Sequence, residues 1–385
     1  MKKVCVVTGT RAEYGLLKPL IRRLNDDEEI KLCFVACGMH LSPEFGLTYQ
    51  EIEEDGYTIH EKNEMLLSSD TPNGITKSIG IGMMGFAEIF TRQQPDMLVL
   101  LGDRFECFAA ATAALVHRIP IAHIHGGELT EGAIDDAFRH SITKMSVLHF
   151  TSTEEYRQRV IQMGESPDRV YNVGALGIEN VKSLKLLSQK ELEERINFKF
   201  DGPVAIVTFH PVTLEGQNSE KQFLALLNVL SQEKNLKCIF TKANADTEGR
   251  IINKMIDEYV LKHNESSISF YSMGQLNYLS ALQYAEFVIG NSSSGIIEVP
   301  SFGIATIDIG DRQKGRVRAE SVIHCEPQER ELKEAVYKAR QIKEQRKMYD
   351  NYNPYEKEDT AGNIIKHIKN ALNNRINVKK CFYDM

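Results

Sequence analysis

The chain has 385 residues and a formal net charge of −7 at pH 7. This length is typical of two domains, and the acidic balance argues against a nucleic-acid binder, whose affinity requires a broad basic surface. The seven cysteines form no Cys-x-x-Cys pair and follow no metal-ligand spacing, so we expect reduced, structural thiols.

The N-terminus begins with apolar residues, but Arg11 and Glu13 interrupt them before they reach the length that a signal peptide needs. No apolar stretch is long enough to span a bilayer. We therefore expect a cytoplasmic protein with neither a membrane partner nor a nucleic-acid partner.

The first half of the chain alternates strand-like and helix-like segments. Short apolar runs, which are typical of buried strands in a parallel sheet, occur at 4–7, 32–36, 97–101, 119–124 and 148–151. Amphipathic helical patterns such as 14–24 and 106–117 lie between them. This alternation predicts a doubly wound, Rossmann-like sheet.

The same pattern restarts in the second half, with apolar runs at 204–209, 237–241, 268–271, 287–289 and 305–309. It predicts a second α/β domain of the same kind. Because glycines cluster near 172–177, we place the domains at 1–176 and 177–359. Two further helices are expected from 329 and from 360, and we expect residues 360–385 to pack back on the first domain.

Ligands of open α/β sheets bind at the carboxyl ends of the strands, so the segments that follow each strand are the candidate sites. The segment Gly9–Gly15 lacks the Gly-x-Gly-x-x-Gly of dinucleotide folds and the Gly-Lys-Ser/Thr of a P-loop. Neither NAD nor ATP is therefore indicated, and we expect no cofactor. Arg11 is either a phosphate clamp or an ordinary surface arginine.

Charged residues are unusually dense after two neighbouring predicted strands. Asp103 and Arg104 follow the strand at 97–101, and they could simply pair with each other. The sixteen residues from 125 to 140 include two histidines, four carboxylates and an arginine, and this density predicts a functional site; its members are His125, Glu128, Glu131, Asp135, Asp136, Arg139 and His140.

A zinc site made of His125, Glu128 and His140 is conceivable, but the His-x-x-x-His spacing of a zinc helix is absent, so we expect no metal. In the second half, His210 directly follows a predicted strand and precedes a proline. A lone histidine is usually structural, yet this position favours a residue that faces the carboxylates of the first domain.

The segment 286–316 carries a candidate anion site. The apolar run at 287–289 ends at Gly290, and Ser292, Ser293 and Ser294 then begin a helix whose free N–H groups suit a phosphate. Glu298 lies about one and a half turns farther on, where a carboxylate suits a ribose diol. The alternative is an ordinary serine-capped helix; nearby basic residues favour an anionic ligand, and these are Arg312, Lys314, Arg316 and Arg318.

Taken together, these motifs resemble one family. The chain is similar to the hydrolysing UDP-N-acetylglucosamine 2-epimerases, the NeuC type of sialic-acid biosynthesis, over nearly its whole length. The motifs Gly-Asp-Arg-Phe-Glu, His-Ile-His-Gly-Gly-Glu, Asp-Asp-Ala-Phe-Arg-His, Phe-His-Pro, Gly-Asn-Ser-Ser-Ser-Gly and Gly-Asp-Arg-Gln-Lys-Gly-Arg carry this resemblance. It implies a GT-B fold, in which two Rossmann-like domains face a central cleft and UDP is held mainly by the second.

The resemblance also implies residue roles. Ser292 and Ser293 would hold the diphosphate and Glu298 the ribose, while Met273 would present backbone groups to the uracil. Arg11 and Arg312 would make further anionic contacts, and Asn244 would lie near the uracil.

The implied reaction has two stages, an elimination of UDP that forms 2-acetamidoglucal and the addition of water that yields N-acetylmannosamine. It requires a base near C2, an acid, and stabilisation of the leaving diphosphate. The carboxylate candidates are Asp103, Glu128 and Asp135, and His210 would orient or neutralise the diphosphate. Arg104, Arg139 and His140 would hold carboxylates or substrate.

One residue departs from the pattern. Some members of the family carry glutamate where His125 stands, and that glutamate is a proposed acid or base. The proton carrier here is then His125 itself or a neighbouring carboxylate; an unperturbed imidazole titrates near pH ~6.5, which suits either role.

Other functions use the same elements. A GT-B glycosyltransferase, a non-hydrolysing epimerase and a UDP-sugar sensor would share the nucleotide site. Within the hydrolysing family, the substrate could instead be a UDP-2,4-diacetamido-2,4,6-trideoxy sugar of a legionaminic-type pathway. We also expect a homodimer, in which the Gly- and Met-rich helix at 75–90 packs against a second copy.

Overall fold

A computed structural model describes residues 1–131, 134–211, 218–243, 249–344, 352–374 and 376–385. The chain forms two compact units. Unit 1 comprises Met1–Glu128, Asp135–Asn180 and Tyr355–Met385, and unit 2 comprises Leu129–Ile134 and Val181–Pro354. These bounds differ by a few residues from the expected bounds at 176 and 359, and the sequence does not predict that Leu129–Ile134 belongs to unit 2.

Unit 1 contains a seven-stranded sheet with the order β3-β2-β1-β4-β5-β6-β7, and its neighbouring strands pair in parallel. The order reverses between β1 and β4, which is the topological switch point where ligands of such sheets bind. The strands are β1 (Lys2–Thr8), β2 (Ile30–Cys37), β3 (Glu61–Asn63), β4 (Met97–Leu101), β5 (Ile121–Ile124), β6 (Leu148–Thr151) and β7 (Val170–Asn172).

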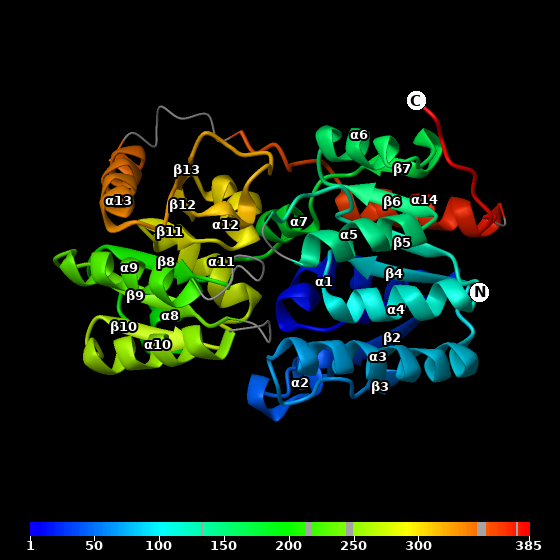
Figure 1. The fold of residues 1–385 in the computed structure, drawn as a ribbon, viewed down its shortest axis with the longest axis horizontal. Helices are drawn as coiled ribbons and strands as arrows, with labels where there is room; N and C mark the ends of the chain where they lie inside the picture. The colour runs from blue at the N-terminus through cyan, green and yellow to red at the C-terminus, as the bar shows by residue number, and fades with distance from the viewer. Residues whose placement is uncertain (132–133, 212–217, 244–248, 345–351, 375) are drawn as a thin grey trace. The chain divides into compact units, whose positions relative to one another are not determined.

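The helices of unit 1 cover both faces of this sheet (Figure 1). One buried apolar cluster joins the sheet to α1 and α14, and another joins it to α3 and α4. The helices are α1 (Arg11–Asp26), α2 (Tyr49–Glu54), α3 (Pro72–Gln93), α4 (Phe105–Val116), α5 (Ile134–Met145), α6 (Glu154–Gln162), α7 (Leu176–Ser183) and α14 (Thr360–Asn373), with 3-10 turns η1 (Gly38–Leu41), η2 (Pro43–Phe45) and η3 (Pro167–Arg169).

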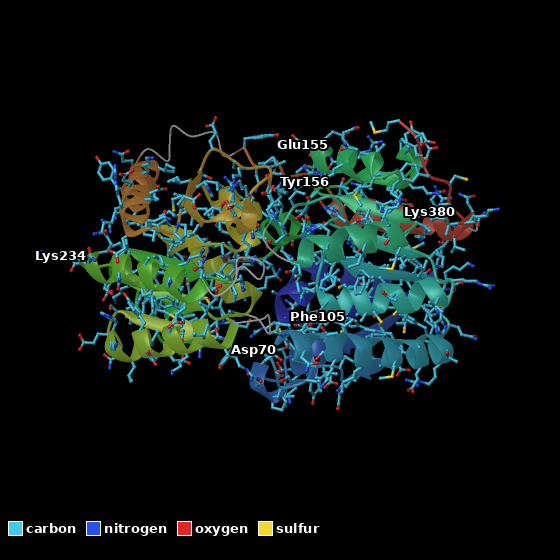
Figure 2. The ribbon with its side chains drawn as sticks, in the orientation of Figure 1. Asp70, Phe105, Glu155, Tyr156, Lys234 and Lys380 are labelled. Carbon is cyan, nitrogen blue, oxygen red and sulfur yellow. The ribbon has the colours of Figure 1, made fainter. Side chains whose placement is uncertain are left out.

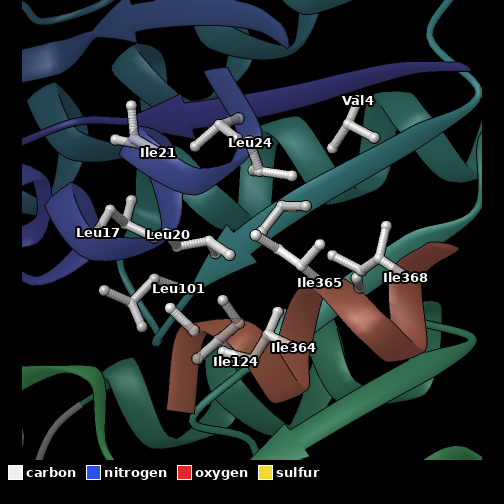
Figure 3. Packing of buried hydrophobic residues seen from close by; sticks show 14 of the residues in the cluster. Val4, Leu17, Leu20, Ile21, Leu24, Leu101, Ile124, Ile364, Ile365 and Ile368 are labelled. Carbon is white, nitrogen blue, oxygen red and sulfur yellow. The ribbon is translucent and has the colours of Figure 1, made fainter. Parts of the chain in front are cut away.

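The C-terminal segment is part of unit 1. Helix α14 places Ile364, Ile365 and Ile368 on one apolar stripe, which packs against α1 and the sheet (Figure 3). The hydroxyl groups of Tyr156 in α6 and Tyr355 are 2.9 Å apart, and Lys380 Nζ donates to the buried carboxylate of Glu165 at 2.7 Å. Tyr156 and Lys380 are labelled in Figure 2. Complete burial of one isoleucine side chain stabilises a fold by about 1.5–3 kcal/mol, so this stripe favours packing of the segment on unit 1.

Unit 2 contains a six-stranded sheet with the order β10-β9-β8-β11-β12-β13, again with parallel neighbours. Its strands are β8 (Val204–Thr208), β9 (Lys237–Thr241), β10 (Ser267–Phe270), β11 (Phe287–Gly290), β12 (Ala305–Ile309) and β13 (Val322–Cys325). Its helices are α8 (Gln189–Ile196), α9 (Ser219–Gln232), α10 (Gly249–Lys262), α11 (Gln275–Tyr284), α12 (Ser293–Ile297) and α13 (Glu329–Glu344), with 3-10 turns η4 (Val299–Phe302) and η5 (Asp311–Gln313).

The prediction of two Rossmann-like, doubly wound α/β domains is confirmed. The apolar runs identified seven of the ten predicted strands within one residue at each end. Strands β1 and β2 begin two residues before the runs at 4–7 and 32–36, and the run at 119–124 begins two residues before β5. The strands that the sequence did not indicate, β3, β7 and β13, lie at sheet edges. They are only three or four residues long and partly exposed, so they lack a continuous apolar run. Among the described helices, none combines the length and apolarity required to cross a bilayer.

Candidate active site

In unit 1, Arg139 joins the carboxyl ends of β4 and β5. Its guanidinium forms an ion pair with Asp103, and its Nη1 donates a hydrogen bond of 2.8 Å to the backbone oxygen of His125. Glu128 Oε2 lies 3.8 Å from the same Nη1. The arginine side chain is only 3% exposed. A buried cation requires opposite charge nearby, and these two carboxylates provide it.

His125 and Glu128 form an imidazole–carboxylate pair beside this arginine. His125 Nδ1 is 3.3 Å from Glu128 Oε1, and the hydroxyl of Ser152 donates to the same oxygen at 2.7 Å. Both His125 and Glu128 are buried. A carboxylate in this position orients the ring and stabilises the charge that the ring gains when it accepts a proton.

The backbone of His125 is strained. Its φ is +65°, in the left-handed region that favours glycine. A non-glycine residue in a sparsely populated region costs on the order of 1–3 kcal/mol and is found most often at functional sites. The conformation of His125, directly after β5, therefore lowers the stability of the fold by this amount.

His123, two residues earlier, has a structural role instead. Its Nε2 donates to the backbone oxygen of Gly102 at 2.7 Å, and its Nδ1 lies 3.1 Å from Thr143 Oγ1. Burial lowers the pKa of His123 to about 3. This ring ties β5 to the turn after β4 and stays uncharged near neutral pH.

Asp103 and Arg104, which the sequence suggested as possible partners of each other, each pair with another charged residue of unit 1. Asp103 binds Arg139, while Arg104 binds Glu106 through two contacts, Nε to Oε2 at 3.1 Å and Nη2 to Oε1 at 3.3 Å. Glu106 is fully buried. The reason lies in the turn, because Arg104 is the N-cap residue of α4 and its side chain folds over the first turn.

Glu13 is a buried carboxyl that sequence reasoning did not select. It accepts a hydrogen bond of 2.6 Å from the backbone N–H of Gly9 and one of 3.1 Å from Cys107 Sγ. Burial, with a smaller contribution from the negative charge of Glu106, raises the pKa of Glu13 to about 7. Its position three residues after the N-cap Thr10 had the appearance of an ordinary capping residue, so the sequence offered no distinguishing signal.

The remaining candidates of unit 1 lie outside this buried group. Arg11 forms an ion pair with Glu51 of α2. His140 Nε2 is 3.4 Å from Asp136 Oδ2 one turn earlier in α5, and both side chains are 29% exposed. Asp135 is half-buried in the first turn of the same helix.

In unit 2, residues 290–294 join β11 to α12 and are called the serine turn here. The turn requires glycine at its first position. Gly290 has a φ of +145°, and a Cβ atom there would lie 1.8 Å from the backbone oxygen of Thr208. Ser292 is the N-cap of α12, and its side chain accepts from the backbone N–H of Ser294. The hydroxyl of Tyr278 is 2.8 Å from Ser294 Oγ. Ser293, the first residue of this helix, is half-buried.

Asn291 gathers the other predicted anion-binding residues around this turn. Its Oδ1 accepts from the backbone N–H of His210 at 2.7 Å, and its Nδ2 donates to the backbone oxygen of His210 at 2.8 Å. Its own backbone oxygen accepts from Gln313 Nε2 at 2.8 Å and from Arg312 Nη1 at 3.3 Å. Sequence reasoning missed Asn291, although it lies inside the quoted serine motif.

Three further predicted residues belong to unit 2 or to its sequence range. Glu298 is the C-cap of α12 and is 6% exposed. Met273 is buried, and its backbone oxygen accepts from Asn277 Nδ2 at 2.8 Å. Asn244 lies outside the described residues.

A separate group of possible cation ligands occurs on the edge of unit 2. Ligand atoms of Asp311, His324 and Glu326 lie within 4.8 Å of one another. His324 and Glu326 are exposed, and Asp311 forms an ion pair with Lys314. These partners account for the group as surface ion pairs.

Comparison with known proteins identifies related chains. A family model described as UDP-N-acetylglucosamine 2-epimerase matches residues 22–369. A Campylobacter jejuni protein named GDP/UDP-N,N'-diacetylbacillosamine 2-epimerase (hydrolyzing) is 44% identical over 325 residues, which are 84% of this chain and 84% of that protein. The Polysialic acid biosynthesis protein P7 of Escherichia coli is 40% identical over 390 residues, covering 100% of this chain and 98% of its own length.

The fold is also found among solved structures. The S. aureus MnaA–UDP co-structure superposes with a TM-score of 0.79 at 17% sequence identity, and the match covers 100% of both chains. This likeness supports the GT-B fold.

Proposed function

Because the chain belongs to the UDP-N-acetylglucosamine 2-epimerase family, we propose that it is a hydrolysing UDP-N-acetylglucosamine 2-epimerase. It converts UDP-N-acetylglucosamine and water into N-acetylmannosamine and UDP. The observation that carries this proposal is the buried group of Asp103, His125 and Glu128 around Arg139, which holds proton-transfer groups at the ends of two neighbouring strands.

The reaction has two stages. First, a base takes the proton from C2 of the sugar, the C1–O bond to UDP breaks, and a C1–C2 double bond forms, which gives 2-acetamidoglucal and UDP. The oxygen of water then adds to C1, and a proton adds to C2 on the face opposite to the one that lost its proton. Because the two proton transfers occur on opposite faces of the ring, two different side chains are required.

We assign these transfers to Asp103 and His125. The side chain of Asp103 is 20% exposed and held by Arg139, so it is oriented and accessible. Glu128 is 2% exposed and already binds Ser152 and His125, which suits it to positioning the imidazole rather than to contacting the sugar. Asp135, half-buried in the first turn of α5, remains a third candidate for a proton transfer.

The UDP moiety binds the serine turn of unit 2 in this proposal. Its diphosphate accepts hydrogen bonds from Ser292 and Ser293 and charge stabilisation from Arg312 and His210, all of which surround Asn291. Glu298 accepts from the ribose. Uracil contacts are assigned to Met273 and Asn244, and additional substrate contacts to Arg11, Arg104 and His140.

Product analysis in D2O tests the proposal. Purified protein is incubated with UDP-N-acetylglucosamine without any acceptor, and the products are followed by NMR. We expect UDP and free N-acetylmannosamine with one deuteron at C2, because the proton that is added comes from solvent. Product without deuterium at C2 would refute the elimination, and UDP-N-acetylmannosamine would identify a non-hydrolysing epimerase.

A second substrate is favoured by one observation. The Campylobacter jejuni relative, at 44% identity, is named for N,N'-diacetylbacillosamine. A UDP-2,4-diacetamido-2,4,6-trideoxy sugar would undergo the same two stages, since only C4 and C6 differ. The ratio of kcat/KM for the two UDP-sugars decides between them, and a preference of more than about tenfold corresponds to about 1.4 kcal/mol of discrimination.

The place of the reaction follows from its product. Free N-acetylmannosamine is a precursor for sialic acid, and the Escherichia coli relative is named for polysialic acid biosynthesis. We therefore propose a role in sialic-acid and capsule polysaccharide synthesis. Loss of the sialylated polysaccharide on gene deletion, restored by added N-acetylmannosamine, is the expected result.

We also propose a homodimer that uses α3. Met84 of this helix is 64% exposed, and a large exposed apolar side chain suits an interface between copies. Light scattering is expected to give twice the chain mass, and Met84→Glu is expected to shift it toward the monomer. A monomeric wild type would reject this part of the proposal.

A further inference from the structure

The loop Leu129–Ile134 has an unusual place in the fold. It belongs to unit 2, although the residues directly before and after it, Glu128 and Asp135, belong to unit 1. Both flanking residues are carboxylate candidates for the reaction. A displacement of Leu129 therefore acts on Glu128 through the single peptide bond between them.

Arg316 holds the start of this loop. Its Nε donates a hydrogen bond of 2.7 Å to the backbone oxygen of Leu129, and its Nη2 donates to Thr130 Oγ1 at 3.3 Å. Arg316 is 7% exposed. Buried hydrogen bonds from a charged donor are stronger than those between neutral groups, so these two contacts hold the start of the loop in place.

The neighbouring Gly315 is shaped for the same contact. Its φ is +76°, and a Cβ atom there would lie 2.6 Å from Leu129 Cδ1 and 2.9 Å from Glu131 Oε1. Only glycine permits the loop to approach so closely. The segment around Gly315 and Arg316 thus forms a fitted seat for Leu129, Thr130 and Glu131.

The same segment reaches the proposed UDP site within one short turn. Arg312 and Gln313, at the end of η5, both donate to the backbone oxygen of Asn291, beside the serine turn. The backbone N–H of Arg316 donates in turn to the backbone oxygen of Gln313 at 3.3 Å. A continuous series of hydrogen bonds therefore runs from Asn291 to Leu129.

We propose that Arg316 is a positioning residue that couples UDP binding to the placement of Glu128. This inference rests on the proposed function. Binding of the diphosphate at the serine turn orders the segment from Arg312 to Arg316, and Arg316 then fixes Leu129 and Thr130, which directly follow Glu128. Arginine is required because its planar fork reaches two acceptors at once, whereas the ammonium of lysine is a single compact donor group.

The test compares Arg316→Lys with Arg340→Lys, a matched control. Arg340 is a half-buried arginine of unit 2 that likewise binds two acceptors, the carboxylates of Glu233 and Glu286. Each variant is assayed for the Kd of UDP by calorimetry, for kcat and KM with the UDP-sugar, and for hydrogen exchange of the peptide 129–134 with and without UDP.

We expect Arg316→Lys to lower kcat at least tenfold while the Kd of UDP changes less than threefold. UDP is expected to slow exchange in the peptide 129–134 in the wild type and in Arg340→Lys, but not in Arg316→Lys. Thr130→Val, which removes only the hydroxyl acceptor, is expected to lower kcat about threefold, and it tests the same link if Arg316→Lys fails to fold.

Two results would overturn the inference. Wild-type kcat in Arg316→Lys would show that the link is not used, and a tenfold weaker UDP affinity would make Arg316 a ligand of UDP instead. A wild type that turns over no UDP-sugar refutes the proposed function separately, because UDP-dependent protection of the loop can still be measured. A wild type that neither binds UDP nor turns over substrate removes both.

Discussion

The candidate sites of the two units are held in place by different interactions. In unit 1, charged side chains determine the geometry, because Arg139 holds Asp103 and the backbone of His125 through a buried ionic network. In unit 2, the geometry depends on the backbone conformation of Gly290 and on neutral hydrogen bonds between the side-chain amide of Asn291 and the backbone of His210. The difference indicates that unit 1 is suited to moving protons and unit 2 to holding a fixed anion.

The largest effect is expected on stability, from a substitution at Gly290 in unit 2. Gly290→Ala would place a Cβ atom 1.8 Å from the backbone oxygen of Thr208 at a φ of +145°, so we expect destabilisation of about 4 kcal/mol or more. Denaturant unfolding measures it. Gly202→Ala is the control, since its Cβ would meet its nearest atom at 3.6 Å; equal stability of the two variants would contradict the backbone argument.

Removal of the central cation tests the ionic side. Arg139→Gln leaves Asp103 and Glu128 without their buried partner, and we expect turnover to fall about 10³-fold, or about 4 kcal/mol. The Kd of UDP is expected to change less than threefold. Arg92→Gln, at an exposed ion pair of unit 1, is expected to leave turnover unchanged. A large loss of UDP affinity in Arg139→Gln would contradict the division between the units.

Glu13 is expected to make the stability of the fold depend on pH. Its pKa is raised from 4.5 to about 7 by burial, so the folded state holds a proton that the unfolded chain releases. Stability is therefore lost as pH rises from about 4.5 to 7, by on the order of 3 kcal/mol. Glu13→Gln cannot ionise, and we expect it to be the more stable form at pH 8 and nearly equal to wild type at pH 4. Parallel stability curves from pH 4 to 8 would show that Glu13 does not titrate in this window.

Replacement of His125 is expected to lower turnover without changing UDP affinity. His125→Ala removes the proposed proton carrier and is expected to lower kcat about 10²-fold, at the low end for general acid–base catalysis. UDP affinity should remain, as calorimetry can show. His117→Ala, at the end of α4, provides the control. Wild-type turnover in His125→Ala would remove this residue from the mechanism. The second proton transfer would then fall to a carboxylate other than Asp103.

The smallest expected effect concerns the serine turn. Ser292→Ala removes the N-cap of α12, which costs about 1 kcal/mol of stability, and it removes one proposed diphosphate contact. We expect UDP to bind about fivefold more weakly while kcat stays within twofold. A fall in kcat without a change in UDP affinity would reverse the roles given to the two units.

Some candidate site residues were selected from local sequence alone, and others were not. Ser292 and His210 were selected because each lies within two residues of a strand that ends at the carboxyl edge of a sheet. Asn291 and Glu13 were missed, since their importance arises from partners at His210 and Cys107 that are distant in sequence. The ion pair of Asp103 with Arg139 was not predicted, because proximity in sequence does not reveal a partner on another helix.

The sequence by itself determined the two Rossmann-like domains. Continuous apolar runs and the helical period depend only on residues that are close together in the sequence. It also determined which strand ends carry charged and hydroxyl groups. Tertiary structure alone decided which charges pair, that Glu13 is buried, and that Leu129–Ile134 belongs to unit 2. The physical reason is that burial, ion pairing and close backbone approach depend on residues far apart in the chain, and these meet only after the sheets have formed.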